Sequence, residues 1–294
     1  MNQCVVMRRT QKHMEKGNDM KFDMHCHTKE GSIDAKVELE SYVKKLAGLG
    51  YDGMLVTDHN SYKGYDRWRT IRRYVQKAAG KPFVVLRGIE YDTRNGGHML
   101  VVLPERVKTR AFEARGMSVQ QLEQLVHKLG GIIGPAHPYG NGYFAFMHTR
   151  AGKKDKALMH KFDFVESFNA CSKPFQNRLA KKLARRYHKP ELGGSDGHRD
   201  EAIGTAFTEI DWDVRNNDDL IRAVKAGAPT VADGDWDDRA RKKHTKFMEQ
   251  FMIYGYWLLN KVLASGNLFR RRRAIQEIRR ENKHEGTIDK RKFT

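Results

Sequence analysis

The sequence has little that would support a disulfide-built, membrane-spanning or dinucleotide-binding protein. Its three cysteines, Cys4, Cys26 and Cys171, share no motif spacing, so we expect no disulfide framework and a reducing cytoplasmic location. No apolar run approaches the roughly eighteen residues of a membrane-spanning helix. No glycine-rich phosphate loop follows the first expected strand, which argues against a doubly wound nucleotide-binding fold.

The charge of the chain is strongly positive and unevenly distributed. Of 294 residues, 39% are hydrophobic and 31% charged, as in a globular protein with a sizeable core. The formal net charge is +19, and residues 239–294 hold sixteen Lys and Arg against five Asp and Glu. This C-terminal excess suggests contact with an anionic surface, although a solvated basic tail would have the same composition.

Short apolar runs alternate with segments of helical periodicity between residues 20 and 235. The runs 20–26, 53–57, 83–90, 98–103, 132–136, 162–166, 193–195, 206–210 and 229–232 are expected strands. The segments 37–49, 65–79, 119–129, 177–187 and 218–226 are expected helices. This alternation predicts an α/β fold with a mainly parallel sheet, and about seven strands with polar ends favour a (β/α) barrel.

Two terminal segments flank the expected barrel. Residues 1–19 show no sustained period, and we expect a disordered leader. Residues 236–294 are expected to form a basic helical extension. Within it, Phe247, Phe251, Tyr254, Leu258 and Val262 recur every three or four residues, and we expect this stripe to pack on the barrel or on a dimer partner. An interfacial membrane helix would show the same pattern.

Histidines and carboxylates recur where the expected strands end. In a strand, residues i and i+2 point to one side, so His25 and His27 can present two imidazoles to one metal ion. The complete set of strand-end candidates is His25, His27, Asp58, His59, Glu90, His98, His137, Asp196 and His198. A set of this size predicts two or three metal ions with a carboxylate bridging a pair.

These residues resemble a known family in their order and spacing. His25-x-His27, Asp58-His59, Glu90, His98, Ala136-His137-Pro138 and Asp196-x-His198 are similar to the motifs of the PHP (polymerase and histidinol phosphatase) family, over about residues 20–235. The resemblance implies a distorted seven-stranded barrel with a multinuclear Zn, Mn or Fe centre that hydrolyses phosphoesters.

The resemblance also implies how the metal ions are held. His25, His27, Glu90 and Asp196 would hold one ion, and Glu90 would bridge to a second ion held by His98 and His137. His59 and His198 would belong to a third site. Many short members have an aspartate five residues after the second histidine, where this chain has Ser32, and Glu30 or Asp34 are the possible substitutes.

The candidate chemistry is hydrolysis of a phosphoric ester. No Ser-His-Asp or Cys-His arrangement is evident, so a metal-bound hydroxide is the expected nucleophile. Glu90, Asp196, His198 and Asp58 are the candidate catalytic residues, although Asp58 is better interpreted as orienting a ligand histidine. Lys29, Lys173 and Arg199 are candidate phosphate-binding cations.

Three other functions remain open. A nuclease could use the basic extension to bind a nucleic-acid backbone, and an amidohydrolase could direct the same nucleophile at a carbonyl. A non-catalytic module stabilised by metal would belong to a different class. Because no candidate ligand lies beyond His198, we expect the residues after Asp238 to be dispensable for chemistry on a small phosphorylated substrate.

Overall fold

The computed structural model describes residues 19–79, 82–107, 110–236, 246–269, 271–273 and 275–276. The expected leader therefore lies outside the described residues, except for Asp19, with which the first strand begins. The strands are β1 (Asp19–Cys26), β2 (Gly53–Val56), β3 (Val84–Asp92), β4 (His98–Val102), β5 (Ile132–Pro135), β6 (Val165–Asn169), β7 (Glu191–Gly194), β8 (Ala206–Asp211) and β9 (Thr230–Gly234).

The helices follow the predicted alternation. The longer ones are α1 (Leu39–Gly48), α2 (Lys63–Ala79), α3 (Val119–Lys128), α6 (Pro174–Arg186), α7 (Asn217–Ala226) and α8 (Lys246–Gly266). The shorter ones are η1 (Arg110–Glu113), η2 (Gly142–Phe144), η3 (Phe146–His148), α4 (Arg150–Lys154), α5 (Ala157–Lys161) and η4 (Asp200–Ala202).

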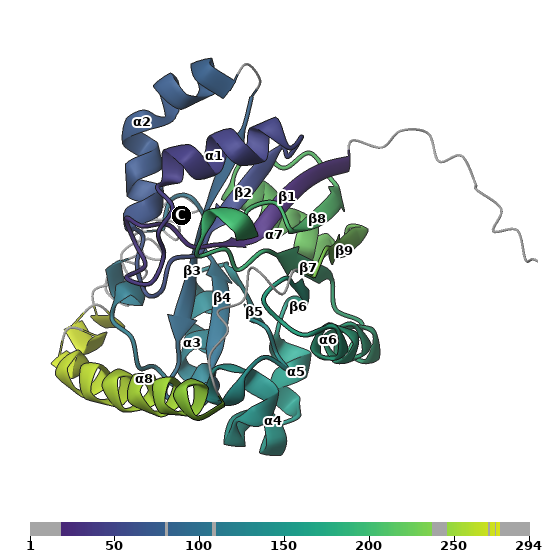
Figure 1. Cartoon of the computed structure of the whole chain (residues 1–294). Helices are drawn as coiled ribbons and strands as arrows, with labels where there is room; N and C mark the ends of the chain where they lie inside the picture. The colour runs from purple at the N-terminus through teal and green to yellow at the C-terminus, as the bar shows by residue number, and fades with distance from the viewer. Residues whose placement is uncertain are drawn as a thin grey trace, which may run out of the picture.

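The strands form one curled seven-stranded sheet and a separate pair (Figure 1). The order in the large sheet is β5-β4-β3-β2-β1-β8-β9, and β6 pairs with β7. Among the strands that the structure describes, only the pairs β1–β2, β2–β3 and β6–β7 are parallel, so the expectation of a mainly parallel sheet is wrong. The turn at 93–97 shows why, because so short a connection can only join antiparallel strands.

The curled sheet is a half-barrel in its hydrogen bonding. Few backbone bonds link the β6–β7 pair to its neighbours: Asp163 N donates to Ile133 O (2.8 Å), Asp196 N to His25 O (2.8 Å) and His27 N to Gly197 O (3.3 Å). Among the described residues these links do not extend into ladders, so a closed (β/α)7 barrel is not confirmed. The sheet does not close because the first half of β1 pairs with β8. Only the end of β1 then faces the segment that follows β7.

The interior of the half-barrel is packed with apolar side chains from successive strands. Fully buried members of this core include Phe22, Met24, Leu55, Leu86, Leu100, Ile132 and Leu192. The neighbours of Leu55, which are Met54 and Val56, lie in a second core that α1 and α2 cover on the outer face. This alternation is that of a strand buried on both faces, and it leaves the strand ends above the core for polar side chains.

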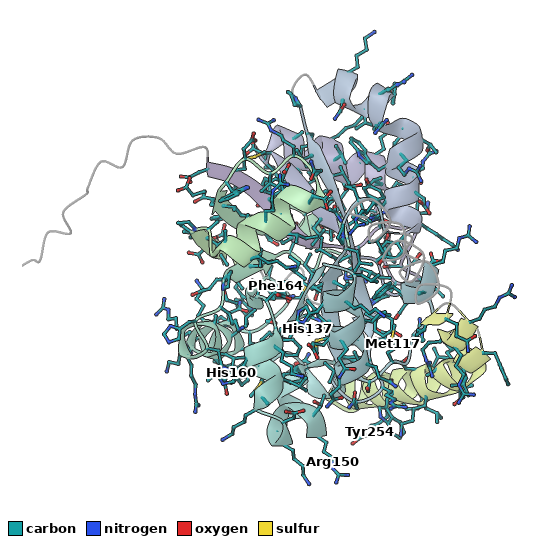
Figure 2. The ribbon with its side chains drawn as sticks, turned by 180° about the vertical axis from the view of Figure 1, so that it is seen from behind. Met117, His137, Arg150, His160, Phe164 and Tyr254 are labelled. Atoms are coloured by element: carbon teal, nitrogen blue, oxygen red, sulfur yellow. The ribbon has the colours of Figure 1, made fainter. Side chains whose placement is uncertain are left out.

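The extension presents its apolar residues to the outside. Phe251, Tyr254, Leu258 and Val262 are each more than half exposed, so packing of this stripe on the barrel is not what the structure shows. Tyr254 lies at the outer edge of the molecule (Figure 2). The face toward the body instead carries Asn260, which is buried. Among the described residues, no helix is both long and apolar enough to cross a membrane.

A glycine at the junction of β5 and β6 provides a test of the half-barrel. A Cβ atom on Gly134 would lie 2.5 Å from both Phe164 Cδ2 and Phe164 O. We expect Gly134→Ala to destabilise the protein by about 1–3 kcal/mol, as overpacked cores do. Gly48→Ala is the control, since a Cβ there meets no atom within 4 Å. Equal thermal unfolding midpoints for the two variants would contradict this close packing.

Candidate metal centre

A bulge in β1 turns both predicted histidines toward the interior. The pairing of β1 with β2 shifts by one residue between Asp23 and Cys26. Met24 therefore packs in the interior core, whereas Cys26 packs in the outer core. His25 and His27 both face inward, with their Nε2 atoms 3.1 Å apart. The prediction that these two imidazoles converge, and that Cys26 points away from them, is confirmed.

The carboxylate of Glu90 lies at the centre of the cluster, with its side chain 1% exposed. One oxygen, Oε2, is 3.4 Å from His25 Nε2, 3.2 Å from His27 Nε2 and 3.1 Å from His59 Nδ1. A buried carboxylate oxygen facing three imidazole nitrogens is a geometry in which one metal ion can take the place of several protons.

The second oxygen of Glu90 faces a different pair of histidines. Oε1 lies 2.8 Å from His98 Nδ1 and 2.9 Å from His137 Nε2. Figure 2 shows His137 in the middle of the molecule. His98 begins β4, yet it joins the strand-end residues because the antiparallel register places it opposite Asp92 at the end of β3. The two oxygens thus serve two ligand sets, as a bridging carboxylate would.

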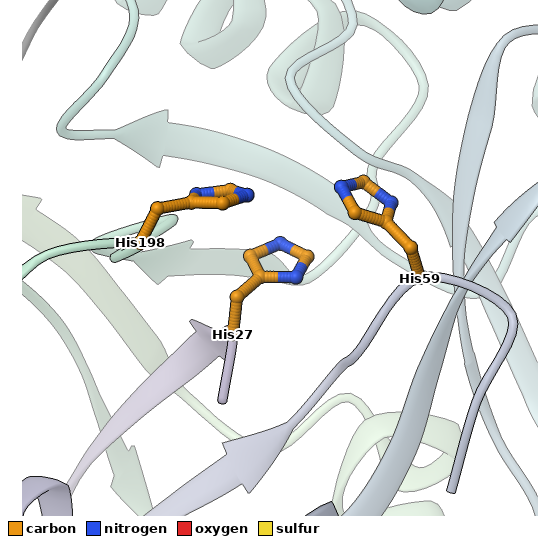
Figure 3. A group of neighbouring side chains, drawn as sticks. All are labelled: His27, His59 and His198. Atoms are coloured by element: carbon orange, nitrogen blue, oxygen red, sulfur yellow. The ribbon is translucent and has the colours of Figure 1, made fainter. Parts of the chain in front are cut away.

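Asp196 and His198 complete the side opposite His98. Asp196 Oδ1 lies 3.2 Å from His27 Nε2 and 3.6 Å from His25 Nε2. His198 stacks on His27, with ring centroids 4.1 Å apart, and His59 stacks on the same ring at 4.5 Å. Figure 3 shows these three imidazoles converging.

Three overlapping groups of side chains could each hold an ion. In each, one ligand atom per residue lies within 4.8 Å of the others: His25, His27 and Glu90; His27, His59 and His198; and His59, Glu90 and His98. Imidazole nitrogens and carboxylate oxygens suit Zn, Mn and Fe. The donor set therefore fits a cluster of divalent ions, and His59 lies between two of its positions.

Asp34, one of the two possible substitutes for the aspartate that the motif lacks at Ser32, contacts a histidine of the cluster. Its Oδ2 lies 3.2 Å from His198 Nε2, beside the group formed by His27, His59 and His198. Glu30, the other possible substitute, is engaged elsewhere, since both of its oxygens accept the backbone N–H of Leu39 at 3.2 Å. Of the two substitutes, only Asp34 reaches the cluster.

Several of the candidate ligand histidines have their second nitrogen held by a partner. His25 Nδ1 lies 2.8 Å from Glu166 Oε1, and His198 Nδ1 lies 2.9 Å from the backbone oxygen of Asp196. With these Nδ1–H groups donated, each Nε2 keeps its lone pair for a metal ion. Glu166, which our list of site residues missed, is buried and also accepts the backbone N–H of His137. The signal that could have found it is its position at the end of the expected strand 162–166.

Asp58 reaches the cluster only through Ser32. Its carboxylate accepts hydrogen bonds from Thr28 N (2.6 Å), Thr28 Oγ1 (2.8 Å) and Ser32 Oγ (3.0 Å). Ser32 Oγ in turn lies 3.1 Å from His27 Nδ1. A Cβ atom on Gly31 would come within 2.0 Å of Asp58 Oδ2, so the carboxylate is closely enclosed. We therefore place Asp58 among the residues that orient a ligand, and not among those that contact substrate.

The electrostatics of the cluster favour exchange of protons for metal ions. Burial would raise the pKa of Glu90, but His98, His59 and His25 hold that pKa well below its usual value. Burial likewise opposes the charge on His27, yet hydrogen bonds to Asp196 and Glu90 raise the pKa of His27 to about 10. Protons thus neutralise the carboxylates when no ion is bound, and a divalent ion would displace them.

The three predicted phosphate-binding cations differ in availability. Lys29 is 58% exposed and its Nζ lies 2.9 Å from Glu38 Oε1, so its charge is already paired at the surface. Arg199 and Lys173 are partly buried, and no carboxylate pairs with either among the described residues. Arg199 directly follows His198 in the sequence.

Asp34 can be tested by metal stoichiometry. If its carboxylate completes the group around His198, Asp34→Asn should bind one equivalent of Mn²⁺ or Zn²⁺ fewer than the parent protein, because an amide carries no charge to balance the ion. Glu30→Gln is the matched control and should leave the stoichiometry unchanged. Equilibrium dialysis followed by elemental analysis measures both. Identical metal content in parent and Asp34→Asn would refute the assignment.

Comparison with known proteins agrees with the motifs. The sequence model of the family described as PHP-associated matches residues 174–229, which include Asp196 and His198. A two-domain protein from Bacteroides vulgatus that contains a predicted PHP-like metal-dependent phosphoesterase is 16% identical, with a TM-score of 0.52, over 79% of this chain and 70% of that one. PsfC from Pseudomonas syringae is 15% identical, with a TM-score of 0.53, over 76% and 93%.

A more distant likeness reaches the lesion-specific endonuclease PfuEndoQ from Pyrococcus furiosus. It is 16% identical, with a TM-score of 0.47, over 73% of this chain and 57% of that one. No curated protein sequence matches the chain. The PHP-associated match over residues 174–229 agrees with the resemblance to the PHP family that the ligand motifs carry, and the structures scored above 0.5 share the fold of this chain.

Proposed function

We propose that the protein is a metal-dependent phosphoesterase that hydrolyses a phosphate ester of a small metabolite or a nucleotide. The observation that carries the proposal is the placement of Glu90, whose two oxygens face separate sets of imidazoles. A carboxylate shared in this way suits two ions a few ångströms apart, the arrangement that clamps the attacking and leaving oxygens of phosphoryl transfer.

Two or three Zn, Mn or Fe ions would supply activated water at neutral pH and neutralise charge on the phosphoryl oxygens. The protein's own residues would hold and orient these ions. Glu90, Asp196 and Asp34 provide the negative charge that the ions need. Buried orienting groups such as Glu166 keep each imidazole in one tautomer, so that no rearrangement precedes binding.

Arg199 and Lys173 would hold the phosphate oxygens that the ions leave free. A guanidinium offers two parallel N–H groups to a phosphate, which makes Arg199 the stronger candidate to fix its orientation. Lys29 stays a prediction with weaker support, since binding would first have to release it from Glu38.

The extension favours an anionic partner in addition to the small substrate. The exposed stripe of α8 is followed by Arg272 and Arg273, and the sequence has no acidic residue between Gln250 and Gln276. We propose that this surface meets nucleic acid or an anionic membrane, of which the first would make the protein a nuclease. An amidohydrolase stays the alternative chemistry. Cys26 and Cys171 are free thiols, in keeping with the cytoplasmic location we propose.

Replacement of the bridging carboxylate tests the proposed reaction. Glu90→Gln should lower turnover of the best phosphate ester by at least about a hundredfold, because loss of metal-site groups has effects of this order. The substrates to compare are phosphomonoesters, phosphodiesters, short RNA and acyl amides. Glu40→Gln is the control, since Glu40 forms a surface pair with Lys44. Near-full activity in Glu90→Gln would reject the bridging role, and turnover of amides alone would reject the phosphoesterase.

The candidate cations can be separated by steady-state kinetics. We expect Arg199→Ala to raise KM about tenfold, because a charge-assisted hydrogen bond contributes about 1.5 kcal/mol. Lys29→Ala should leave KM within about twofold, since an exposed ion pair contributes little. The reverse order of effects would show that the substrate approaches from the α1 side of the cluster.

A further inference from the structure

The segment that follows η1 connects the metal cluster to the C-terminal extension. Arg115 Nη1 lies 3.1 Å from Asp92 Oδ2, and the carboxylate of Asp92 is fully buried. The other oxygen of the same carboxylate, Oδ1, lies 3.1 Å from His98 Nε2. Since His98 Nδ1 faces Glu90, the carboxylate of Asp92 holds the opposite nitrogen of a ligand ring.

This contact is of the kind that sets ligand basicity and orientation in metal sites. The contact between Asp92 Oδ1 and His98 Nε2 is an ion pair, and the negative charge beside Nε2 favours a proton there, which leaves Nδ1 of the same ring as the metal ligand. Asp92 also accepts a hydrogen bond from Asn60 Nδ2 (2.6 Å). Arg115 is the cation that balances this buried charge, so the position of Asp92 depends on the position of Arg115.

The backbone of the same segment is fastened to the end of β3. Gly116 N donates to Asp92 O (3.2 Å), and Met117 N donates to the hydroxyl of Tyr91 (3.0 Å). Gly116 has φ +99°, a conformation that glycine adopts without strain. These bonds tie Arg115 and Gly116 to the strand that carries Glu90.

The extension holds this segment from the other side. Arg271 Nη1 donates to the backbone oxygen of Arg115 (2.8 Å) and also lies 3.3 Å from Ala264 O near the end of α8. The approach is close, because a Cβ atom on Gly116 would lie 2.4 Å from Ala264 Cβ. Ile275 packs against the hydrophobic core that contains Tyr91 and Met117.

We propose that Arg271 is a positioning residue for the metal centre, acting through Arg115 and Asp92 on His98. The extension is then part of the site's support, contrary to the expectation that residues after Asp238 are dispensable for chemistry. Loss of the Arg271 side chain frees the carbonyl of Arg115, lets the guanidinium shift, and leaves Asp92 to reorient within reach of His98. The consequence is weaker metal binding at the His98 side of Glu90. The proposal rests on the metal centre and is independent of which ester the protein hydrolyses.

Metal affinity of the full-length protein tests this chain of contacts without any substrate. Mn²⁺ alone is titrated into metal-free protein, with competition by a chelator of known affinity. We expect Arg271→Ala to weaken one metal equivalent about tenfold, at the lower end of effects seen when groups behind a metal ligand are lost. Arg271→Lys should recover part of the affinity, because one ammonium donor can still reach the carbonyl of Arg115.

Two further variants distinguish positioning from a general loss of packing. Arg272→Ala is the matched control, as Arg272 is the exposed neighbour of Arg271, and should bind Mn²⁺ like the parent. Gly116→Ala should also weaken Mn²⁺ binding, since its Cβ would lie 2.8 Å from Arg271 Nη1, and its thermal midpoint is measured beside its affinity because φ +99° strains alanine as well. A lower thermal midpoint for Arg271→Ala with unchanged Mn²⁺ affinity would overturn the proposal.

The outcome for activity separates this proposal from the proposed function. If Arg271→Ala weakens Mn²⁺ binding while the parent hydrolyses no phosphate ester, the phosphoesterase fails and the positioning role stands. If the parent is active and Arg271→Ala has both parental Mn²⁺ affinity and parental kcat at limiting Mn²⁺, the positioning role fails and the phosphoesterase stands.

Discussion

The structure depends on one buried charge, the carboxylate of Glu90 above the packed interior of the half-barrel. An isolated carboxylate in such a place would be costly, because burial removes the water that stabilises its charge. The chain offsets this cost with imidazoles from several strand ends, which in the metal-free protein must bring protons to the carboxylate. Divalent ions supply the same positive charge without protons. Protons and divalent ions can therefore each balance the negative charge of the cluster.

The ligand atoms of the cluster are set by groups that never face a substrate. Glu166 fixes the ring of His25, and Ser32, held by Asp58, fixes the ring of His27. Each of these orienting groups is buried, so its rotamer is determined by packing as well as by its hydrogen bonds. Side chains that are already held in place lose little conformational entropy when they bind an ion. This favours tight binding of the ion over transient binding.

The sequence predicted the cluster better than it predicted the sheet. Candidate ligands such as His25 and Asp196 could be found because barrel-like folds collect polar side chains where strands end, and that rule needs no knowledge of strand direction. The antiparallel strands were not foreseen, because an apolar run has the same period in either direction. Asp34 could not be separated from Glu30, since spacing within a loop does not fix where side chains point. Glu166 was missed because it belongs to none of the motifs that carry the family resemblance, although it ends the expected strand 162–166.

The extension shows that an apolar period predicts a helix but not which face of the helix is buried. Spacing of three and four residues correctly predicted a helix, but an apolar stripe does not state which face of the helix meets the protein. In the structure, α8 turns buried Asn260 toward the body and exposes Leu258 and Val262. The contacts that join the extension to the segment after η1 come from Ala264 and Arg271, and Ile275 packs on the core beside that segment. The end of α8 contacts the body of the protein through the close approach of Ala264 to Gly116 and through the hydrogen bond from Arg271 to the backbone oxygen of Arg115. The apolar stripe takes no part in these contacts and is exposed, so it can meet a partner outside the chain.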